Sequence, residues 1–267
     1  MTLLHAVVLG IIQGLSEFLP ISSSAHLTLT PWLLHWSEPG LSFDVALHTG
    51  TLVAVLAYFR AEWVRLLVAF WKIVTTRRVE TETQRRVVYL IIATIPGGIA
   101  GVLLDKYAES TFRSPQLIAI AMIVLGVLLW LVDRAARETR ALAAMRPLDA
   151  VWIGVAQIFA LIPGVSRSGA TITAGLADRF DRESAAVFSF LMSMPIILAA
   201  ALFKVPHVIH DQGLSAPLIA GVLASALSGW LAISALLRYV SRRSYGIFAL
   251  YRVVVGLGVL LIVHYRG

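Results

Sequence analysis

The chain has 267 residues, of which 58% are hydrophobic and only 14% charged, and its mean hydropathy is +0.83. This composition lies outside the range of soluble domains and predicts an all-α polytopic membrane protein, a single integral membrane domain over residues 1–267. Lys and Arg outnumber Asp and Glu by 22 to 15, yet no nucleic-acid-binding motif accompanies them, so we expect no nucleic-acid partner. The absence of cysteine excludes disulfides, thiolate metal sites and cysteine nucleophiles.

The first apolar segment, residues 3–19, is short for a membrane span and ends at Pro20, before a cluster of small polar residues. Residues 152–165 form a similar segment, broken at Pro163. Such a segment can enter the membrane as a half-helix, turn at the proline and leave by the same face, provided that protein or water surrounds the turn. We therefore predict two re-entrant helical segments.

Six further runs are predicted to cross the membrane, because each approaches the roughly 20 apolar residues that a bilayer requires. The first is weak because it is short, and the last because it contains an arginine. The six are residues 45–59, 87–104, 116–132, 185–203, 215–237 and 247–263. Residues 63–74 are amphipathic and are predicted to lie at the membrane interface.

Basic residues gather in alternate loops. Segments 72–86, 134–146 and 238–243 hold five, four and three Lys or Arg, whereas the intervening loops hold two and one. Because cytoplasmic loops are enriched in Lys and Arg, these three segments are predicted to face the cytoplasm, which places the N-terminus outside.

The two re-entrant segments also resemble each other, "GIIQGLSEFLPISSSAH" from Gly10 and "GVAQIFALIPGVSRSG" from Gly154. With one gap they match at Gly10 and Gly154, Gln13 and Gln157, Pro20 and Pro163, and Ser23 and Ser166. Each is followed by three predicted spans, and an odd number of crossings inverts the second copy relative to the first. We predict an inverted repeat of residues 1–133 and 150–267, with the two turns meeting near the membrane midplane.

Glu17 lies four residues after Gln13, on the same helical face and beside the first turn. A carboxylate at membrane depth is costly and by default functional. The alternative is an interfacial carboxylate exposed to water.

Ser22, Ser23 and Ser24 occupy a predicted helix N-terminus, where hydroxyls and unpaired backbone N–H groups can hold an anion. Simple N-capping would explain one serine of the three. His26 follows them and is either a general acid or base or a structural residue.

In the second turn Arg167 stands between Ser166 and Ser168, with Gly164 and Gly169 permitting close backbone approach to a ligand. A guanidinium presents several donors to a phosphate in a fixed geometry. The alternative is an arginine that reaches toward the interface. His5, His48 and Arg252 fall inside or beside apolar segments and could line a cavity, but packing or interfacial placement explains each equally well.

The motifs "QGLSEFLPISSSAH" and "PGVSRSGAT" resemble the two signature regions of the bacterial undecaprenyl-diphosphatase family, membrane enzymes associated with bacitracin resistance. The resemblance extends over nearly the whole chain. It implies hydrolysis of undecaprenyl diphosphate, a polyprenyl diphosphate lipid, to undecaprenyl phosphate and inorganic phosphate, which recycles the carrier lipid for cell-wall synthesis. It also implies a divalent cation, Mg²⁺ or Ca²⁺, a multi-pass location in the bacterial inner (plasma) membrane among membrane lipids, and often a homodimer.

By position, Glu17 matches the acidic residue of the family's Glu/Gln-x-x-x-Glu motif, with Gln13 in its variable first place. The resemblance thereby implies Glu17 and Gln13 as metal ligands, although Gln13 removes one charged ligand. The implied catalytic residues are Glu17, Ser23, His26 and Arg167. The substrate-binding residues that we predict are Ser22, Ser24, Ser166, Arg167, Ser168 and Gly169.

Two questions stay open from the sequence. Ser23 is either the nucleophile or only a phosphate ligand, with Glu17 or His26 activating water. The same broken helices would also suit a transporter or flippase for an anionic lipid or small anion, because transporters place helix N-termini at a midplane site.

Overall fold

The computed structural model describes residues 1–37, 40–109 and 113–266, except for the side chains of residues 41–42, 105–109 and 207–212. Within these ranges the regular elements are helical, which confirms the predicted all-α class. The α-helices are α1 Leu3–Phe18, α2 Ser23–Leu34, α3 Leu41–Tyr58, α4 Arg60–Thr76, α5 Glu82–Glu109, α6 Pro115–Ala135, α7 Pro147–Ile158, α8 Arg167–Ala177, α9 Arg182–Gln212, α10 Ala216–Val240 and α11 Gly246–Arg266. Two short 3₁₀ helices, η2 Leu142–Ala144 and η3 Phe159–Leu161, flank α7.

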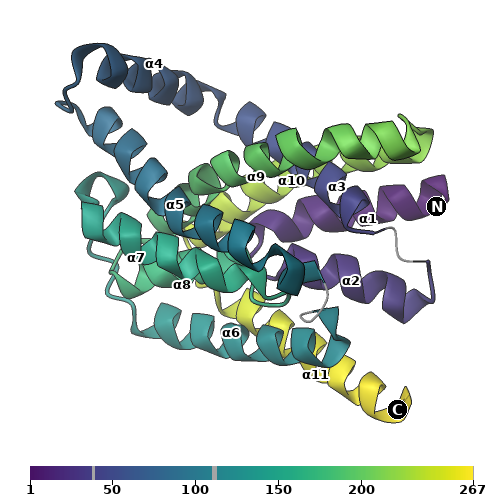
Figure 1. The fold of residues 1–267 in the computed structure, drawn as a ribbon. Coiled ribbons are helices and arrows are strands. Elements are labelled where there is room, and N and C mark those ends of the chain that lie inside the picture. The colour runs from purple at the N-terminus through teal and green to yellow at the C-terminus, as the bar shows by residue number, and fades with distance from the viewer. Residues whose placement is uncertain (38–39, 110–112, 267) are drawn as a thin grey trace.

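In the described part of the chain five helices, α5, α6, α9, α10 and α11, are long and apolar enough to cross a membrane. They contain five of the six predicted spans (Figure 1). The sixth predicted span, residues 45–59, lies in α3, whose apolar part, Phe43–Tyr58, belongs with the shorter helices. The predicted interfacial segment forms α4, which lies apart from the main bundle in Figure 1. Which face of the membrane each helix end meets stays a prediction.

Both predicted helix breaks are present. The first separates α1 from α2 at residues 19–22, and the second separates η3 from α8 at residues 162–166. Pro20 and Pro163 lie in these breaks, where a residue that lacks an N–H and restricts its predecessor is favoured.

Each second helix begins at a serine with a left-handed backbone. Ser22 has φ 79° and Ser166 has φ 73°, and these conformations turn the chain sharply into α2 and α8. The Ser22 hydroxyl accepts a hydrogen bond from the N–H of Ala25, and the Ser166 hydroxyl accepts one from the N–H of Gly169. Both serines are therefore N-caps of the same kind.

The matching caps correct the sequence alignment of the two turns. Ser22 and Ser166 are equivalent by conformation and by hydrogen bonding, and their separation equals that of the predicted glycine and glutamine pairs. No gap is needed, because only the prolines are one residue out of register. The predicted pairing of Ser23 with Ser166 is therefore wrong, and Ser23 corresponds to Arg167.

The helices pack in matched pairs. Helix α1 packs on α10 and α7 packs on α5, while α6 packs on α11 and α3 on α9. Exchanging α1–α2–α3–α5–α6 with α7–α8–α9–α10–α11 reproduces each of these pairings. The pattern supports the predicted repeat of residues 1–133 and 150–267, whose boundaries stay a prediction.

Glycines allow the two re-entrant helices to approach their partners closely. A Cβ at Gly10 would lie 2.2 Å from the carbonyl oxygen of Gly221 on α10, and a Cβ at Gly154 would lie 2.6 Å from that of Ala93 on α5. Lipid tails are as apolar as leucine side chains, so the hydrophobic effect does not drive membrane helices together. Close packing at small residues holds them together instead.

Gly10→Ala should therefore destabilise the protein by about 1–3 kcal/mol, the usual cost of inserting a methyl group where there is no room. Thermal unfolding in detergent measures this. The control is Gly98→Ala on α5, where a Cβ meets nothing within 4 Å. An equal melting temperature for the two variants would contradict the close α1–α10 contact.

Candidate active site

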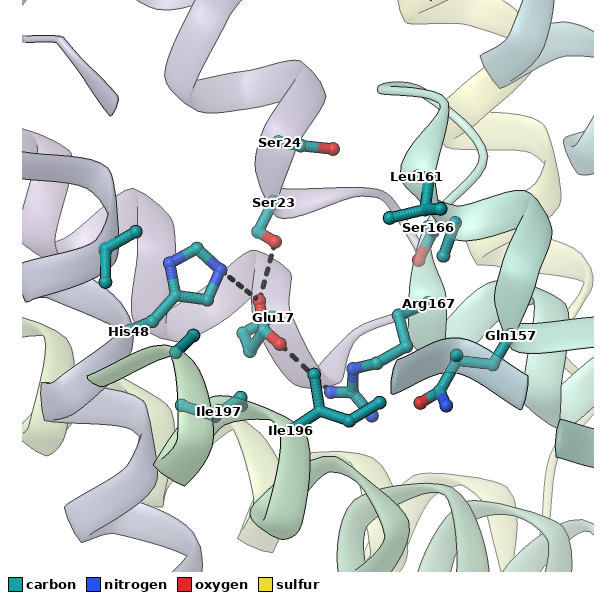
Figure 2. A pocket seen from close by; sticks show the side chains of 14 residues that line it. Glu17, Ser23, Ser24, His48, Gln157, Leu161, Ser166, Arg167, Ile196 and Ile197 are labelled. Atoms are coloured by element: carbon teal, nitrogen blue, oxygen red, sulfur yellow. Dashed lines mark hydrogen bonds and ion pairs between the residues drawn. The ribbon is translucent and has the colours of Figure 1, made fainter. Parts of the chain in front are cut away.

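An open cavity of about 260 Å³ lies where the two turns face each other, bordered by α3, α5, α7 and α9 (Figure 2). The first turn presents Glu17, Ser23 and Ser24 to it, and the second presents Ser166 and Arg167. The remaining walls are largely apolar, apart from one histidine and one glutamine. They consist of Val45, His48, Gly97, Gln157, Ala160, Leu161, Ile196, Ile197 and Ala200.

Glu17 is the centre of the polar contacts, although it is only 6% exposed. Its Oε2 accepts hydrogen bonds from the Ser23 hydroxyl at 2.6 Å and from Nε2 of Gln13 at 3.1 Å. The same oxygen lies 3.4 Å from Nε2 of His48, and Oε1 accepts from Arg167 at 3.0 Å. A buried carboxylate requires such partners. The structure therefore excludes the alternative of a carboxylate exposed to water.

Arg167 connects three elements. One terminal nitrogen of its guanidinium donates to Glu17, and the other donates to the backbone carbonyl of Ser189 on α9 at 3.0 Å. The side chain is 13% exposed, so it does not reach away to an interface. A guanidinium has five N–H donors, and these two hydrogen bonds do not use all of them. The remaining N–H groups are available to an anion in the cavity.

His48, which the sequence left unassigned, faces Glu17 from α3. Its Nδ1 lies 2.7 Å from the carbonyl oxygen of Asp44. Because a carbonyl only accepts, Nδ1 carries a proton, and Nε2 points toward the carboxylate. No local motif marks this residue, since the contact joins two helices.

His26 does not line this cavity. Its Nδ1 donates to the carbonyl oxygen of Ser22 at 2.7 Å, and its Nε2 therefore accepts from the Tyr251 hydroxyl at 2.7 Å. The ring stacks on Tyr251 of α11. The bond back to Ser22 turns the imidazole away from Glu17, so the structure does not bring together these two predicted catalytic residues.

Three predicted substrate-binding residues lie behind the cavity rather than in its wall. The Ser22 hydroxyl accepts from the N–H of Gly164 at 3.1 Å, and the Ser168 hydroxyl donates to the carbonyl of Glu17 at 3.1 Å. Each of these serines thus bonds the opposite turn. Gly169 makes room for an arginine, since a Cβ there would lie 2.8 Å from a terminal nitrogen of Arg252.

Arg252 of α11 holds the two turns together from behind. It is fully buried and donates to Pro20 of the first turn at 3.0 Å and to Gly164 and Val165 of the second at 2.7 and 2.9 Å. It also donates to the carbonyl of Met122 on α6. Among the described residues no carboxylate forms an ion pair with it, so backbone carbonyl dipoles surround its charge.

The donor atoms around Glu17 and Gln13 decide whether the predicted metal site can hold a cation. Within the described ranges no group of three or more His, Cys, Asp or Glu could hold a metal ion. Both oxygens of Glu17 already accept from protein donors, two of which belong to basic side chains. Among the described residues, the unpaired amide oxygens near the site are Oε1 of Gln13 and Oε1 of Gln157. Mg²⁺ and Ca²⁺ require about six or more oxygen ligands. The residues do not fit a resident cation.

Comparison with known proteins gives a consistent result. The family model described as bacitracin resistance protein BacA matches residues 6–258. The chain is 59% identical to the undecaprenyl-diphosphatase of Gemmatimonas aurantiaca over 96% of both chains. It is 50% identical to that of Moorella thermoacetica over 95% of both, and 48% identical to that of Pelotomaculum thermopropionicum over 98% of this chain and 97% of the relative. These matches cover both turns.

Arg252→Lys should lower the stability by about 2 kcal/mol, because one ammonium group cannot reach all four carbonyls and leaves buried acceptors unpaired. Thermal unfolding is the measurement. Arg238→Lys is the matched control, since Arg238 is exposed and bonds only within α10. If Arg252→Lys and the control melted at the same temperature, the proposed role of Arg252 in holding the two turns together would be contradicted.

Proposed function

The chain belongs to the bacitracin resistance protein BacA family, and from this membership we propose that it is an undecaprenyl-diphosphatase. It hydrolyses undecaprenyl diphosphate to undecaprenyl phosphate and inorganic phosphate, and so recycles the carrier lipid for cell-wall synthesis. The chain is a multi-pass membrane protein, and its proposed location is the bacterial inner membrane. A homodimer remains a prediction that rests on the family resemblance alone.

One observation carries the chemical proposal. The hydroxyl of Ser23 donates to one oxygen of the buried Glu17 carboxylate at 2.6 Å, and Arg167 donates to the other oxygen. A nucleophile, a base and a phosphate-binding cation thus share one cavity. This is the set that phosphoryl transfer through a covalent intermediate requires.

In the proposed first step, Oγ of Ser23 bonds to the terminal phosphorus of the diphosphate. The bond between that phosphorus and the bridging oxygen breaks, its electron pair leaves with undecaprenyl phosphate, and the serine proton passes to Glu17. In the second step the oxygen of water bonds to the phosphorus of the phosphoserine and the bond between that phosphorus and Oγ of Ser23 breaks. Glu17 returns its proton to Oγ, and inorganic phosphate leaves with the water oxygen and both water protons. This route is favoured over direct activation of water because the Ser23 hydroxyl already occupies the carboxylate.

The other polar groups act on charge and position. Negative charge on the transferring phosphoryl oxygens faces the free donors of Arg167 and the hydroxyls of Ser24 and Ser166, which are fixed before the reaction. His48 fixes the Glu17 carboxylate from α3. His26 acts by position, because it holds the carbonyl of Ser22 directly before the nucleophile.

We propose that Mg²⁺ or Ca²⁺ enters with the substrate, chelated by the diphosphate, rather than as a resident ion. The charge arrangement supports this, because Arg167 and His48 already occupy Glu17, the one carboxylate among the described residues that line the cavity.

Purified protein in detergent should release inorganic phosphate from undecaprenyl diphosphate, which a transporter or flippase would not do. Glu17→Gln should lower turnover at least about 100-fold, since a general base contributes that much or more. Ser23→Ala should be similarly impaired and should form no phosphoserine. Near-normal turnover in Glu17→Gln, with the protein folded, would contradict the role of this carboxylate.

Arg167→Lys should lose most of its activity, much like Arg167→Ala. An ammonium group keeps the charge but cannot bond Glu17, Ser189 and a phosphate in the planar geometry of a guanidinium. Steady-state kinetics on both variants separates the two effects, with the loss in kcat if the contact strengthens in the transition state. A nearly active lysine variant would show that charge alone suffices.

If the cation enters with the substrate, Mg²⁺ alone should leave the melting temperature of the protein unchanged, while chelator should abolish phosphate release. Thermal melts with and without Mg²⁺, and assays with and without EDTA, provide the comparison. Stabilisation by Mg²⁺ without substrate would point to a resident ion instead.

A further inference from the structure

Gln157 on α7 is a buried amide without a partner. It is 4% exposed and lines the cavity, yet neither its Oε1 nor its Nε2 has a hydrogen-bond partner in the described part of the chain. Leaving a buried polar group unpaired is costly, and proteins seldom do so without a functional reason. An amide that is unpaired in the protein and borders a cavity is suited to bind a ligand there.

The corrected repeat register explains why this amide has no partner. Its equivalent in the first repeat, Gln13, donates to Glu17 four residues later. The position four residues after Gln157 is Leu161. The second repeat therefore retains the amide but not the carboxylate that would satisfy it.

The surroundings hold the amide in place. A Cβ on Gly97 of α5 would lie only 2.3 Å from Nε2 of Gln157, so this glycine provides the space that the amide occupies. Figure 2 shows Gln157 on the Arg167 side of the cavity, away from Ser23. Arg167 thus lies between Ser23 and the amide of Gln157 in this view.

We propose that Gln157 binds the second phosphoryl group of the substrate, the one that stays with the lipid, and so selects a diphosphate over a monophosphate. This proposal rests on the proposed function. Ser23 and Arg167 engage the terminal phosphoryl group, and a diphosphate carries a second group one bridging oxygen away. The amide offers two N–H donors to its oxygens without adding charge, and Oε1 accepts from a protonated phosphate oxygen or water.

The test is Gln157→Leu, which replaces the unpaired amide with an apolar group of similar size. Its melting temperature should equal or exceed that of the unaltered protein, because the substitution removes unsatisfied polar atoms. Its kcat/KM for undecaprenyl diphosphate should fall about 10- to 100-fold, the value of a hydrogen bond to a charged group.

Gln84→Leu is the matched control. Gln84 is also buried, but its Oε1 accepts from the backbone N–H groups of Glu80 and Thr81 at 2.8 and 2.9 Å. This variant should melt at a lower temperature while the folded fraction keeps its activity. A purely structural Gln157 would give the same result as Gln84.

A binding measurement makes the outcome independent of turnover. Methylenediphosphonate, a diphosphate analogue that is not hydrolysed, should raise the melting temperature of the unaltered protein more than inorganic phosphate does. Gln157→Leu should lose this difference but keep the response to phosphate. If the unaltered protein releases no phosphate from the lipid, the proposed function fails, and the same melts still decide the role of Gln157. A preserved preference for the diphosphonate, or a loss of stability in Gln157→Leu like that in Gln84→Leu, would overturn the proposal.

Discussion

The ion pair between Glu17 and Arg167 is the constraint on which the rest of the site depends. A buried carboxylate is costly unless charged and hydrogen-bonding partners surround it, and Arg167 supplies the positive charge for Glu17. Each repeat contributes one member, so neither half of the chain can bury its own charge. The pair therefore fixes how the halves meet and sets the reactive groups at their junction. The remaining wall of the cavity is largely apolar, apart from His48, which faces the carboxylate, and the amide of Gln157.

The surrounding contacts keep this junction rigid. The hydroxyls of Ser22 and Ser168 cross from one turn to the other, and Arg252 bonds the backbone of both. These groups make no contact with the cavity, yet they set the distance between Ser23 and Arg167. A site that binds a highly charged ligand gains from such support, because its donors need no rearrangement when the ligand arrives.

The sequence could predict the features that are set by residues close together in the chain. The helix breaks, the serine caps and the position of Glu17 beside the first turn all follow from residues within a few positions of one another. Long-range contacts were missed. His48 reaches Glu17 from another helix, and His26 faces away from Glu17 toward Tyr251, which is more than two hundred residues distant in sequence. The sequence alignment of the two turns needed a gap because it paired Pro20 with Pro163. The N-cap serines, Ser22 and Ser166, share one backbone conformation and align the two turns without a gap.

The packing of α1 on α10 has a consequence for how the protein is made. Helix α1 leaves the ribosome long before α10 does, so it finds this glycine-lined partner only after the helices between them have been synthesised. Until then the half-helix that carries Glu17 can contact α2 and α3 but lacks α10 and the arginine of the second repeat. Contacts between such distant segments close late. The contacts that complete the junction, including those of Arg252 on α11, therefore form only after both turns have been synthesised.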